Sequence, residues 1–313
     1  MPKVLIADNI SDVVCEIFDT NNIEYEKKVG LSEDELSAEI KGYDGLLIRS
    51  AVTVTKKIIE SSDNLKVIGR PGVGVDNVDL QASSEKNIVV MNTPLGNVQA
   101  TAELTFGIIH SLMRKIHIAN SSMHNKKWEK KKLIGNELLG KNIAIIGFGN
   151  IGKKVADFAK AYGMNIIVVS ETASSGDVDY LNAKVMKFDD MLSEADIITF
   201  HNKLSEKSKY IINSESLKQM KKNSIVINCA RGGIVNEADM KEALEKEIIS
   251  GYGCDVYEVE PQTDPIFCGM NNVVMTPHIG AGTSEAQEKV AVQIAEQVSD
   301  YLINNNIVNK VKP

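Results

Sequence analysis

The sequence predicts an α/β protein made of two doubly wound parallel-sheet domains. Short apolar runs of strand length recur along the chain, and stretches of helical period lie between most of them. Continuous apolar strands that alternate with helices are typical of a parallel sheet buried on both faces. A length of 313 residues is enough for two such domains.

The apolar runs predict the strands in chain order. They lie at residues 4–7, 45–48, 67–68, 88–91, 143–146, 166–169, 197–200, 225–228 and 273–275. Amphipathic stretches at 11–20, 153–162 and 237–246 have the period of helices that pack on a sheet. The stretch at 100–118 is more continuously apolar, so we expect one long helix that is packed on several sides.

The domain boundaries follow from the order of these elements. The turn "NTPLGN" precedes the long apolar helix, which places a domain junction near residues 96–101. A final helical stretch at 284–303 follows the last predicted strand, and we expect it to return to the first domain. The prediction is a domain of residues 1–98 completed by 284–313, with residues 99–283 inserted as a second domain.

Composition excludes several classes of function. The formal net charge of −7 argues against a general nucleic-acid-binding protein, which needs a cationic surface to displace counterions. No apolar run approaches the length of a membrane span, and the N-terminal run meets Asp8 too early for a signal peptide. The cysteines stand apart without a C-x-x-C spacing, which favours free thiols in a reducing compartment over disulfides or a metal site. We therefore expect a cytoplasmic protein without a metal.

The basic run "KKWEKKK" at residues 126–132 is a local exception to the acidic composition. One interpretation is a solvated loop, which is the usual role of a charge run. The other is a rim that attracts an anionic ligand.

A glycine-rich turn is the first candidate for chemistry. The sequence "IIGFGNIG" leaves a predicted strand and opens a predicted helix, with Gly147, Gly149 and Gly152 in the G-x-G-x-x-G spacing. In a dinucleotide site these glycines allow a tight turn, close approach to the pyrophosphate, and packing of helix on strand. A purely structural turn is the alternative, but the strand–turn–helix–strand context favours a dinucleotide.

The residue expected to bind the adenosine ribose is less regular. An Asp or Glu at the end of the next strand usually bonds the ribose 2′-hydroxyl, but that position is Ser170, and Glu171 follows it. The turn "SETASSGD" contains no Arg or Lys that would favour a 2′-phosphate. We therefore predict NAD as the cofactor, with a modest preference over NADP.

Three further residues each follow a predicted strand, so they are expected to meet at one edge of the sheet. They are Arg231 in "NCARGGIVNE", Glu260 in "DVYEVEP" and His278 in "TPHIGAGT". A His near neutral pKa can move the hydroxyl proton of a 2-hydroxy acid, and a carboxylate can orient its imidazole. An Arg can bind the substrate carboxylate through two hydrogen bonds. Each residue alone has a structural explanation, but their combination downstream of a dinucleotide turn predicts a dehydrogenase.

These motifs resemble the signatures of the D-isomer-specific 2-hydroxyacid dehydrogenases, and the resemblance covers essentially the whole chain. It implies a Rossmann cofactor domain inserted into a flavodoxin-like substrate domain, and a homodimer formed through the cofactor domain. It also implies that Arg231, Glu260 and His278 are catalytic. The cofactor residues that the motifs and the resemblance predict are Gly147, Gly149, Asn150, Ile151, Gly152, Ser170, Asn202, Cys229, Asp255 and Gly280.

The first half of the chain resembles the branch of this family that acts on 3-phosphoglycerate. The similar stretches are "LLIRSAVTVT", "KVIGRPGVGVDNVDL", "IVVMNTPLGN", "TAELTFGIIHSLMR" and "KWEKKKLIGNELLGK". The resemblance implies that Arg49 and Ser50 contact substrate and that the amides of Val73 and Gly74 bind its carboxylate. It further implies phosphate contacts from Arg70 and from the lysines near Trp128, across a dimer.

The resemblance thus implies NAD-dependent oxidation of 3-phospho-D-glycerate to 3-phosphohydroxypyruvate, a reaction of serine biosynthesis. Thr53, Val73 and Lys203 depart from that branch, which often has Lys, Thr and Pro at these positions. The alternatives are a glycerate/hydroxypyruvate reductase or other D-2-hydroxyacid dehydrogenase and, more remotely, an NADH-sensing corepressor-like protein. Because the chain ends at Pro313 just after the returning helix, no regulatory domain and no feedback control by serine are expected.

Overall fold

The structure, a computed structural model, describes all of residues 1–313. It divides into two compact units, one made of Met1–Asn97 with Ala281–Pro313 and the other of Val98–Gly280. The second unit is therefore a continuous segment inserted in the sequence of the first. Each unit contains its own parallel sheet, which confirms the predicted fold class.

The sheet of the first unit has five strands in the order β2-β1-β3-β4-β5. All neighbours are parallel. In chain order the strands are β1 (Lys3–Ile6), β2 (Glu24–Lys27), β3 (Gly45–Leu47), β4 (Val67–Arg70) and β5 (Val89–Asn92). The C-terminal tail extends this sheet, because the amide of Val311 donates to the carbonyl of Val90 at 2.8 Å.

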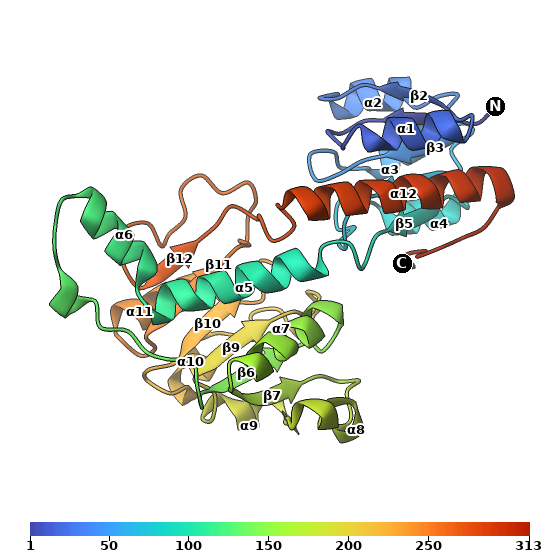
Figure 1. Cartoon of the computed structure of the whole chain (residues 1–313). Helices are drawn as coiled ribbons and strands as arrows, with labels where there is room; N and C mark the ends of the chain where they lie inside the picture. Colours follow the sequence, from blue (N-terminus) through green and yellow to red (C-terminus); the bar gives the residue numbers. More distant parts are fainter. The chain divides into compact units, whose positions relative to one another are not determined.

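Helices cover both faces of this sheet (Figure 1). On one face, α1 (Val13–Thr20) and α12 (Ser284–Asn304) enclose the core around Phe18, Ile294 and Val298. On the other, α2 (Glu33–Glu39), α3 (Lys56–Ser61) and α4 (Leu80–Glu85) enclose a second core. Alternate strand residues face opposite cores, which explains why the strands are apolar on both sides.

The sheet of the second unit has seven parallel strands in the order β12-β11-β10-β9-β6-β7-β8. The strands are β6 (Asn142–Ile146), β7 (Asn165–Val169), β8 (Lys184–Val185), β9 (Ile197–Phe200), β10 (Ile225–Asn228), β11 (Gly251–Cys254) and β12 (Val273–Met275). The strand order reverses between β6 and β9, where ligands bind in open α/β sheets, outside the carboxyl ends of the strands.

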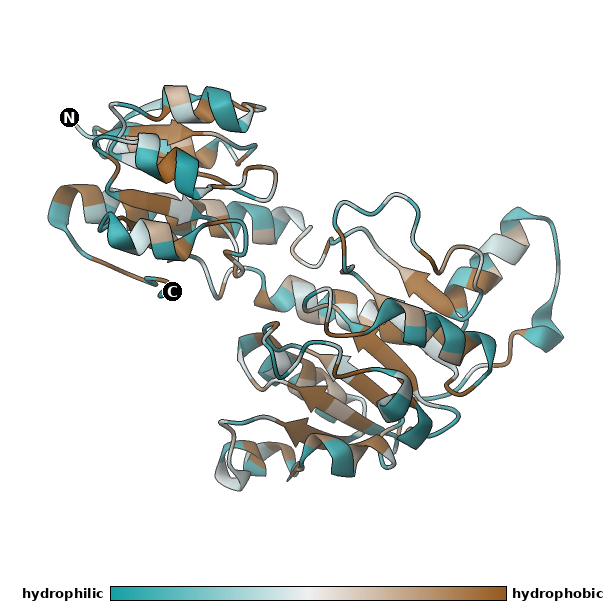
Figure 2. Ribbon diagram, turned by 180° about the vertical axis from the view of Figure 1, so that it is seen from behind, coloured by the Kyte–Doolittle hydropathy of each residue, from teal (hydrophilic) through white to brown (hydrophobic).

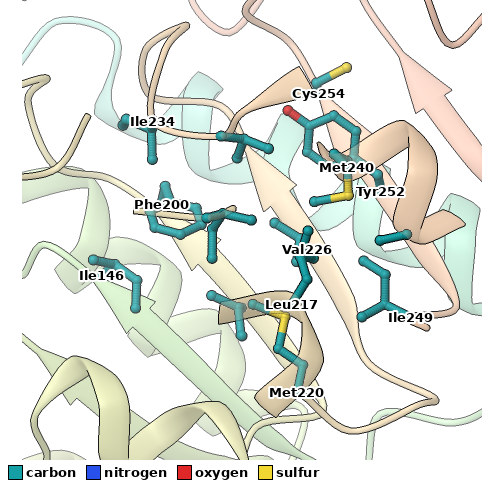
Figure 3. Packing of buried hydrophobic residues seen from close by; sticks show 14 of the residues in the cluster. Ile146, Phe200, Leu217, Met220, Val226, Ile234, Met240, Ile249, Tyr252 and Cys254 are labelled. Atoms are coloured by element: carbon teal, nitrogen blue, oxygen red, sulfur yellow. The ribbon is translucent and has the colours of Figure 1, made fainter. Parts of the chain in front are cut away.

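Two helical layers sandwich this second sheet. One contains α5 (Val98–Met113), α7 (Asn150–Ala161) and the short α8 (Ser175–Val178). The other contains α9 (Phe188–Leu192), α10 (Ser214–Gln219) and α11 (Glu237–Glu245). Figure 3 shows side chains of this second layer, such as Leu217 and Met240, packed over Phe200, Val226 and Tyr252 of the strands. The strands are the most hydrophobic elements of each unit in Figure 2.

The prediction of one helix over 100–118 was wrong. The helix α5 ends at Met113, and a separate helix, α6 (Ile116–His124), begins after Lys115. Lys115 has a left-handed backbone, with φ of 53°, which ends the helical path and turns the chain. Figure 1 shows α6 and the following segment extending away from the sheet of their own unit.

No helix of the structure is both long enough and apolar enough to cross a lipid bilayer.

Candidate active site

The glycine turn connects β6 to α7 and has the geometry of a phosphate cradle. Gly147 has φ of +90°, and a Cβ there would lie 2.7 Å from the amide nitrogen of Asn202. A Cβ at Gly152 would lie 2.1 Å from the carbonyl oxygen of Gly147. These two glycines are therefore required for the turn itself, whereas Gly149, which precedes α7, has no atom within 4 Å of an added Cβ.

The open space at Gly149 lies at the amino end of a helix of 12 residues. The first amides of a helix lack partners within the helix, and its dipole favours an anion there. The residues present thus fit a dinucleotide pyrophosphate, with Asn150 and Ile151 forming the first turn of α7. Asn202 lies against the same turn, since it follows His201, whose amide donates to the carbonyl of Ile146 at 2.7 Å.

The edge beyond β7, where the ribose is expected, contains both charged and polar side chains. The hydroxyl oxygen of Ser170 accepts hydrogen bonds from the amides of Thr172 and Ala173, at 3.2 and 3.3 Å. Glu171 forms an ion pair with Lys207 of the segment after β9, with 2.6 Å between Oε1 and Nζ. Ser170 thus shapes the turn, and Glu171 is the carboxylate at this edge.

His278 and Glu260 form a hydrogen-bonded pair, with 2.6 Å between Nδ1 and Oε2. The other oxygen of Glu260 accepts from the amide of Tyr257 at 3.0 Å, which fixes the carboxylate. The hydrogen bond to Glu260 raises the pKa of His278 above its usual value, although burial opposes this. Burial would raise the pKa of Glu260, but its bonds to His278 and Tyr257 outweigh burial and lower that pKa.

Arg231 interacts electrostatically with both members of this pair. Its turn is closed by Asn228, which accepts from the amide of Ala230 at 3.1 Å and donates to the carbonyl of Arg231 at 2.9 Å. A Cβ at Gly232 would lie 1.7 Å from the carbonyl oxygen of Tyr257, so only glycine lets this turn pack on the loop after β11. The sequence "ARGG" therefore brings Arg231 to the loop that carries Glu260.

Asp255 holds the loop that carries His278. Its carboxylate accepts from the amides of Ile279 and Gly280, at 2.8 and 2.7 Å, and from the hydroxyl of Thr276 at 2.6 Å. The side chain is buried, and burial raises its pKa although these hydrogen bonds act in the opposite direction. The backbone of His278 is left-handed, with φ of 54°, so these contacts maintain an uncommon conformation.

Cys229 and Gly280, which the sequence predicts at the cofactor, lie beside this loop. Cys229 is buried, and burial raises the pKa of its thiol to about 12, so it is not a reactive thiolate. Gly280 is held from both sides, since its amide donates to Asp255 and its carbonyl accepts from the hydroxyl of Thr101 at 3.1 Å.

In the first unit, Arg49 and Ser50 follow β3, the strand next to β1 at the point where strand order reverses. Asp8, which follows β1, accepts from the amides of Arg49 and Ala51 at 2.8 and 3.0 Å and so fixes the backbone. The guanidinium of Arg49 is half-buried and makes no hydrogen bond to the protein, and burial lowers its pKa. The charge of Asp8 opposes this shift, and a half-buried guanidinium whose donors have no acceptor in the protein can bind an anionic ligand.

The loop after β4 presents two free backbone donors. The carbonyl of Val73 accepts from the side chain of Asn92 at 2.6 Å, and that of Gly74 accepts from the guanidinium of Arg70. The amides of Val73 and Gly74 donate no hydrogen bond within the protein. Adjacent amides of this kind form an anion-binding nest.

Comparison with known proteins identifies the family. Residues 106–280 match the family model described as the NAD-binding domain of D-isomer-specific 2-hydroxyacid dehydrogenases. The chain belongs to this family. The family predicted from the sequence motifs is thereby confirmed, and the glycine turn lies within the matched NAD-binding domain.

Curated relatives extend the match to nearly the whole chain. The D-3-phosphoglycerate dehydrogenases of Synechocystis and Bacillus subtilis are 41% and 40% identical over 97% and 96% of this chain. This chain covers 54% and 57% of their lengths, and so spans about half of each. A hydroxypyruvate reductase of Thermotoga maritima is 44% identical over 86% of this chain and 88% of its own.

Solved structures agree on the architecture. The TT0316 protein of Thermus thermophilus has 29% identity and a TM-score of 0.91, with 99% of both chains covered. An NAD⁺-bound 3-phosphoglycerate dehydrogenase of Entamoeba histolytica has 26% identity and a TM-score of 0.84, with 100% of this chain and 99% of that chain covered.

Several positioning residues of this site were missed in the sequence. Asn228 closes the Arg231 turn, and Thr276 and Tyr257 orient the carboxylates of Asp255 and Glu260. Asn228 had a recognisable signal, because an Asn at the end of a strand often bonds the backbone of the following turn. Thr276 and Tyr257 had none, since their partners are identified only by the folded loops.

Proposed function

We propose that this dehydrogenase oxidises 3-phospho-D-glycerate to 3-phosphohydroxypyruvate with NAD⁺, as a D-3-phosphoglycerate dehydrogenase of serine biosynthesis. The observation that carries the substrate assignment is Arg49, a half-buried cation whose guanidinium has no hydrogen-bond partner in the protein. A phosphate dianion would supply that partner. The names of the curated relatives from Synechocystis and Bacillus subtilis support the same substrate.

His278 is proposed as the acid and base of the reaction. In the oxidation it takes the proton of the substrate hydroxyl on Nε2, and in the reduction it returns that proton to the carbonyl oxygen. Glu260 holds Nδ1 at 2.6 Å, which orients the ring and stabilises the imidazolium that forms. When bound, the nicotinamide ring of the cofactor accepts or supplies the hydride of the reaction.

Arg231 is proposed to bind the substrate carboxylate. Its planar guanidinium suits two parallel hydrogen bonds to a carboxylate, which would fix the substrate's orientation. In the first unit, the amides of Val73 and Gly74 are proposed as donors to an anionic group of the substrate, because they have no acceptor within the protein. Ser50 and Arg70 complete the proposed substrate contacts.

Replacing Glu260 with Gln is expected to move the pH profile of kcat to lower pH. The hydrogen bond to Glu260 raises the pKa of His278, so an uncharged partner lowers it. The reduction needs protonated His278 and is lost as pH rises through that pKa; in the variant this loss occurs at lower pH. The oxidation needs neutral His278, so its activity appears at lower pH. Profiles of kcat in both directions measure the shift, and an unchanged inflection would contradict the role of Glu260.

Replacing Arg49 with Gln is expected to lower kcat/KM for 3-phosphohydroxypyruvate by about 10- to 100-fold, the usual worth of a hydrogen bond to a charged group. Hydroxypyruvate, which lacks the phosphate, should be affected much less. Arg114→Gln, at an exposed arginine after α5, is the matched control. Equal losses on both substrates would show that Arg49 does not recognise the phosphate.

NAD is proposed as the preferred cofactor, because the carboxylate of Glu171 beyond β7 would repel a 2′-phosphate.

The reaction is proposed to occur in the cytoplasm, which suits the four free cysteines.

A homodimer through the cofactor domain is also proposed. The segment from α6 to β6 extends away from its sheet (Figure 1). It exposes the large apolar side chains of Ile116, Met123, Trp128, Ile134 and Leu139. Several exposed large apolar side chains on one segment favour a protein interface. The mass of the purified chain from sedimentation equilibrium tests whether it is a dimer.

The lysines beside Trp128 are solvent-exposed, and we propose that they attract the substrate phosphate.

Hydroxypyruvate reduction is the second candidate function. The Thermotoga relative supports it, since this chain covers 88% of its length at 44% identity. Thr53, in place of a lysine common among phosphoglycerate enzymes, also favours a substrate without phosphate. Oxidation of NADH on addition of 3-phosphohydroxypyruvate, hydroxypyruvate or neither tests both candidates. It also separates an enzyme from an NADH-sensing protein, which would consume no NADH.

A further inference from the structure

The Glu171–Lys207 ion pair lies at the edge of the sheet where the adenosine ribose of a dinucleotide is recognised. Glu171 is the second residue after β7, and Lys207 belongs to the segment that follows β9. Their Oε1 and Nζ atoms are 2.6 Å apart. Both side chains remain strongly exposed, at 76% and 81%, so neither is buried by its partner.

Ser170 cannot distinguish the two cofactors by charge. Its hydroxyl oxygen already accepts from the amides of Thr172 and Ala173, which leaves it as a structural group of the turn. Glu171 and the paired ammonium of Lys207 are charged groups that can make this distinction. A lone carboxylate repels a 2′-phosphate, whereas a carboxylate paired with an ammonium repels it much less.

We infer that Lys207 is a residue that determines cofactor specificity, because it distinguishes a hydroxyl from a phosphate at the 2′ position of the adenosine ribose. With a 2′-hydroxyl bound, Lys207 stays on Glu171, whose other oxygen is available to the ribose. With a 2′-phosphate bound, the ammonium moves to the phosphate and offsets the repulsion from Glu171. The inference rests on the proposed ribose position and does not depend on which 2-hydroxy acid is the substrate.

Two properties of the pair support this exchange. Exposed ion pairs contribute little to stability, so the lysine is readily released from Glu171. An ammonium on a flexible side chain binds as a point charge without a fixed geometry, so it can pair either with the Glu171 carboxylate or with a 2′-phosphate. This pair would produce the modest preference for NAD that the sequence predicts, although the turn contains a carboxylate and no arginine.

The test compares the binding of NADH and NADPH, which differ only in the 2′-phosphate, by fluorescence titration of the wild type and variants. Lys207→Met should raise the Kd for NADPH by about 10-fold, which corresponds to the loss of one charge-assisted contact. The Kd for NADH should change by less than about 2-fold. Glu171→Gln should strengthen the binding of NADPH relative to that of NADH. Lys209→Met is the matched control, because this lysine of the same segment lies over the ring of Tyr210, 5.7 Å from its centroid.

The Lys207 effect should shrink at high ionic strength, since the contact is exposed. If Lys207→Met weakens the binding of NADH and NADPH equally, or weakens the binding of neither, the inference is overturned. Binding is measured without substrate, so a chain that binds both nucleotides but fails on 3-phosphohydroxypyruvate refutes the proposed substrate alone. A wild-type chain that binds neither nucleotide overturns the ribose placement and Lys207's role with it.

Discussion

Replacing His278 with Asn is expected to lower kcat by about 10²- to 10⁴-fold, the usual contribution of a positioned acid–base group. Asparagine keeps a polar side chain of similar size at Nδ1, but it cannot take up or release a proton near neutral pH. The Kd for NADH should change little, because the glycine turn and the edge beyond β7 are separate from this loop in sequence and are unaltered.

The geometry makes this prediction specific. His278 has a carboxylate 2.6 Å from Nδ1, and its loop is held by three donors to Asp255. His124→Asn, at an exposed position at the end of α6, provides a control with the same change of side chain. A kcat near the wild-type value in His278→Asn would remove His278 from the proton transfer.

Replacing Arg231 with Lys is expected to lower kcat/KM by about 10- to 100-fold, although the charge is kept. The loss corresponds to one charge-assisted hydrogen bond, because an ammonium offers a point charge where the guanidinium offers two parallel donors. The interaction of Arg231 with Glu260 and His278 should also weaken, so part of the loss is expected in kcat.

The control for Arg231 is Arg114→Lys, the same substitution at an exposed residue of the same unit. Steady-state kinetics over a range of 3-phosphohydroxypyruvate concentrations separate the effects on KM and kcat. If Arg231→Lys retains both constants, Arg231 only closes its turn and does not bind substrate.

The interior strands were predictable because their signal is local. A strand buried on both faces is a continuous apolar run, as in β6, β9 and β10. The edge strands β2 and β8 lack that signal, since their residues are mostly exposed or half-buried. The strand β11 was also missing from the predicted strands because it contains Gly251 and Gly253. A Cβ at Gly253 would lie 2.2 Å from Ile108 of α5, so close helix packing requires the residue that weakens the strand signal.

The candidate site was predictable where residue chemistry and strand position coincide. Arg231, Glu260 and His278 follow strands of one parallel sheet, whose carboxyl ends meet at one edge, and the structure brings Glu260 and His278 into contact. The contacts of Asp255 were not predictable, because its partners lie in a loop more than 20 residues later. The Glu171–Lys207 pair, with a separation of 36 residues, likewise depends on the neighbouring positions of two loops.

The central claim is that the substrate carries a phosphate, and one comparison tests it most directly. It is the ratio of kcat/KM for 3-phosphohydroxypyruvate to that for hydroxypyruvate, measured with NADH on the wild-type chain at low and high salt. Two charge-assisted contacts to the phosphate would give a ratio of roughly several hundred, which should fall as salt screens the exposed lysines. Equal efficiency on the two acids would contradict the phosphoglycerate assignment and leave a dehydrogenase of unphosphorylated 2-hydroxy acids.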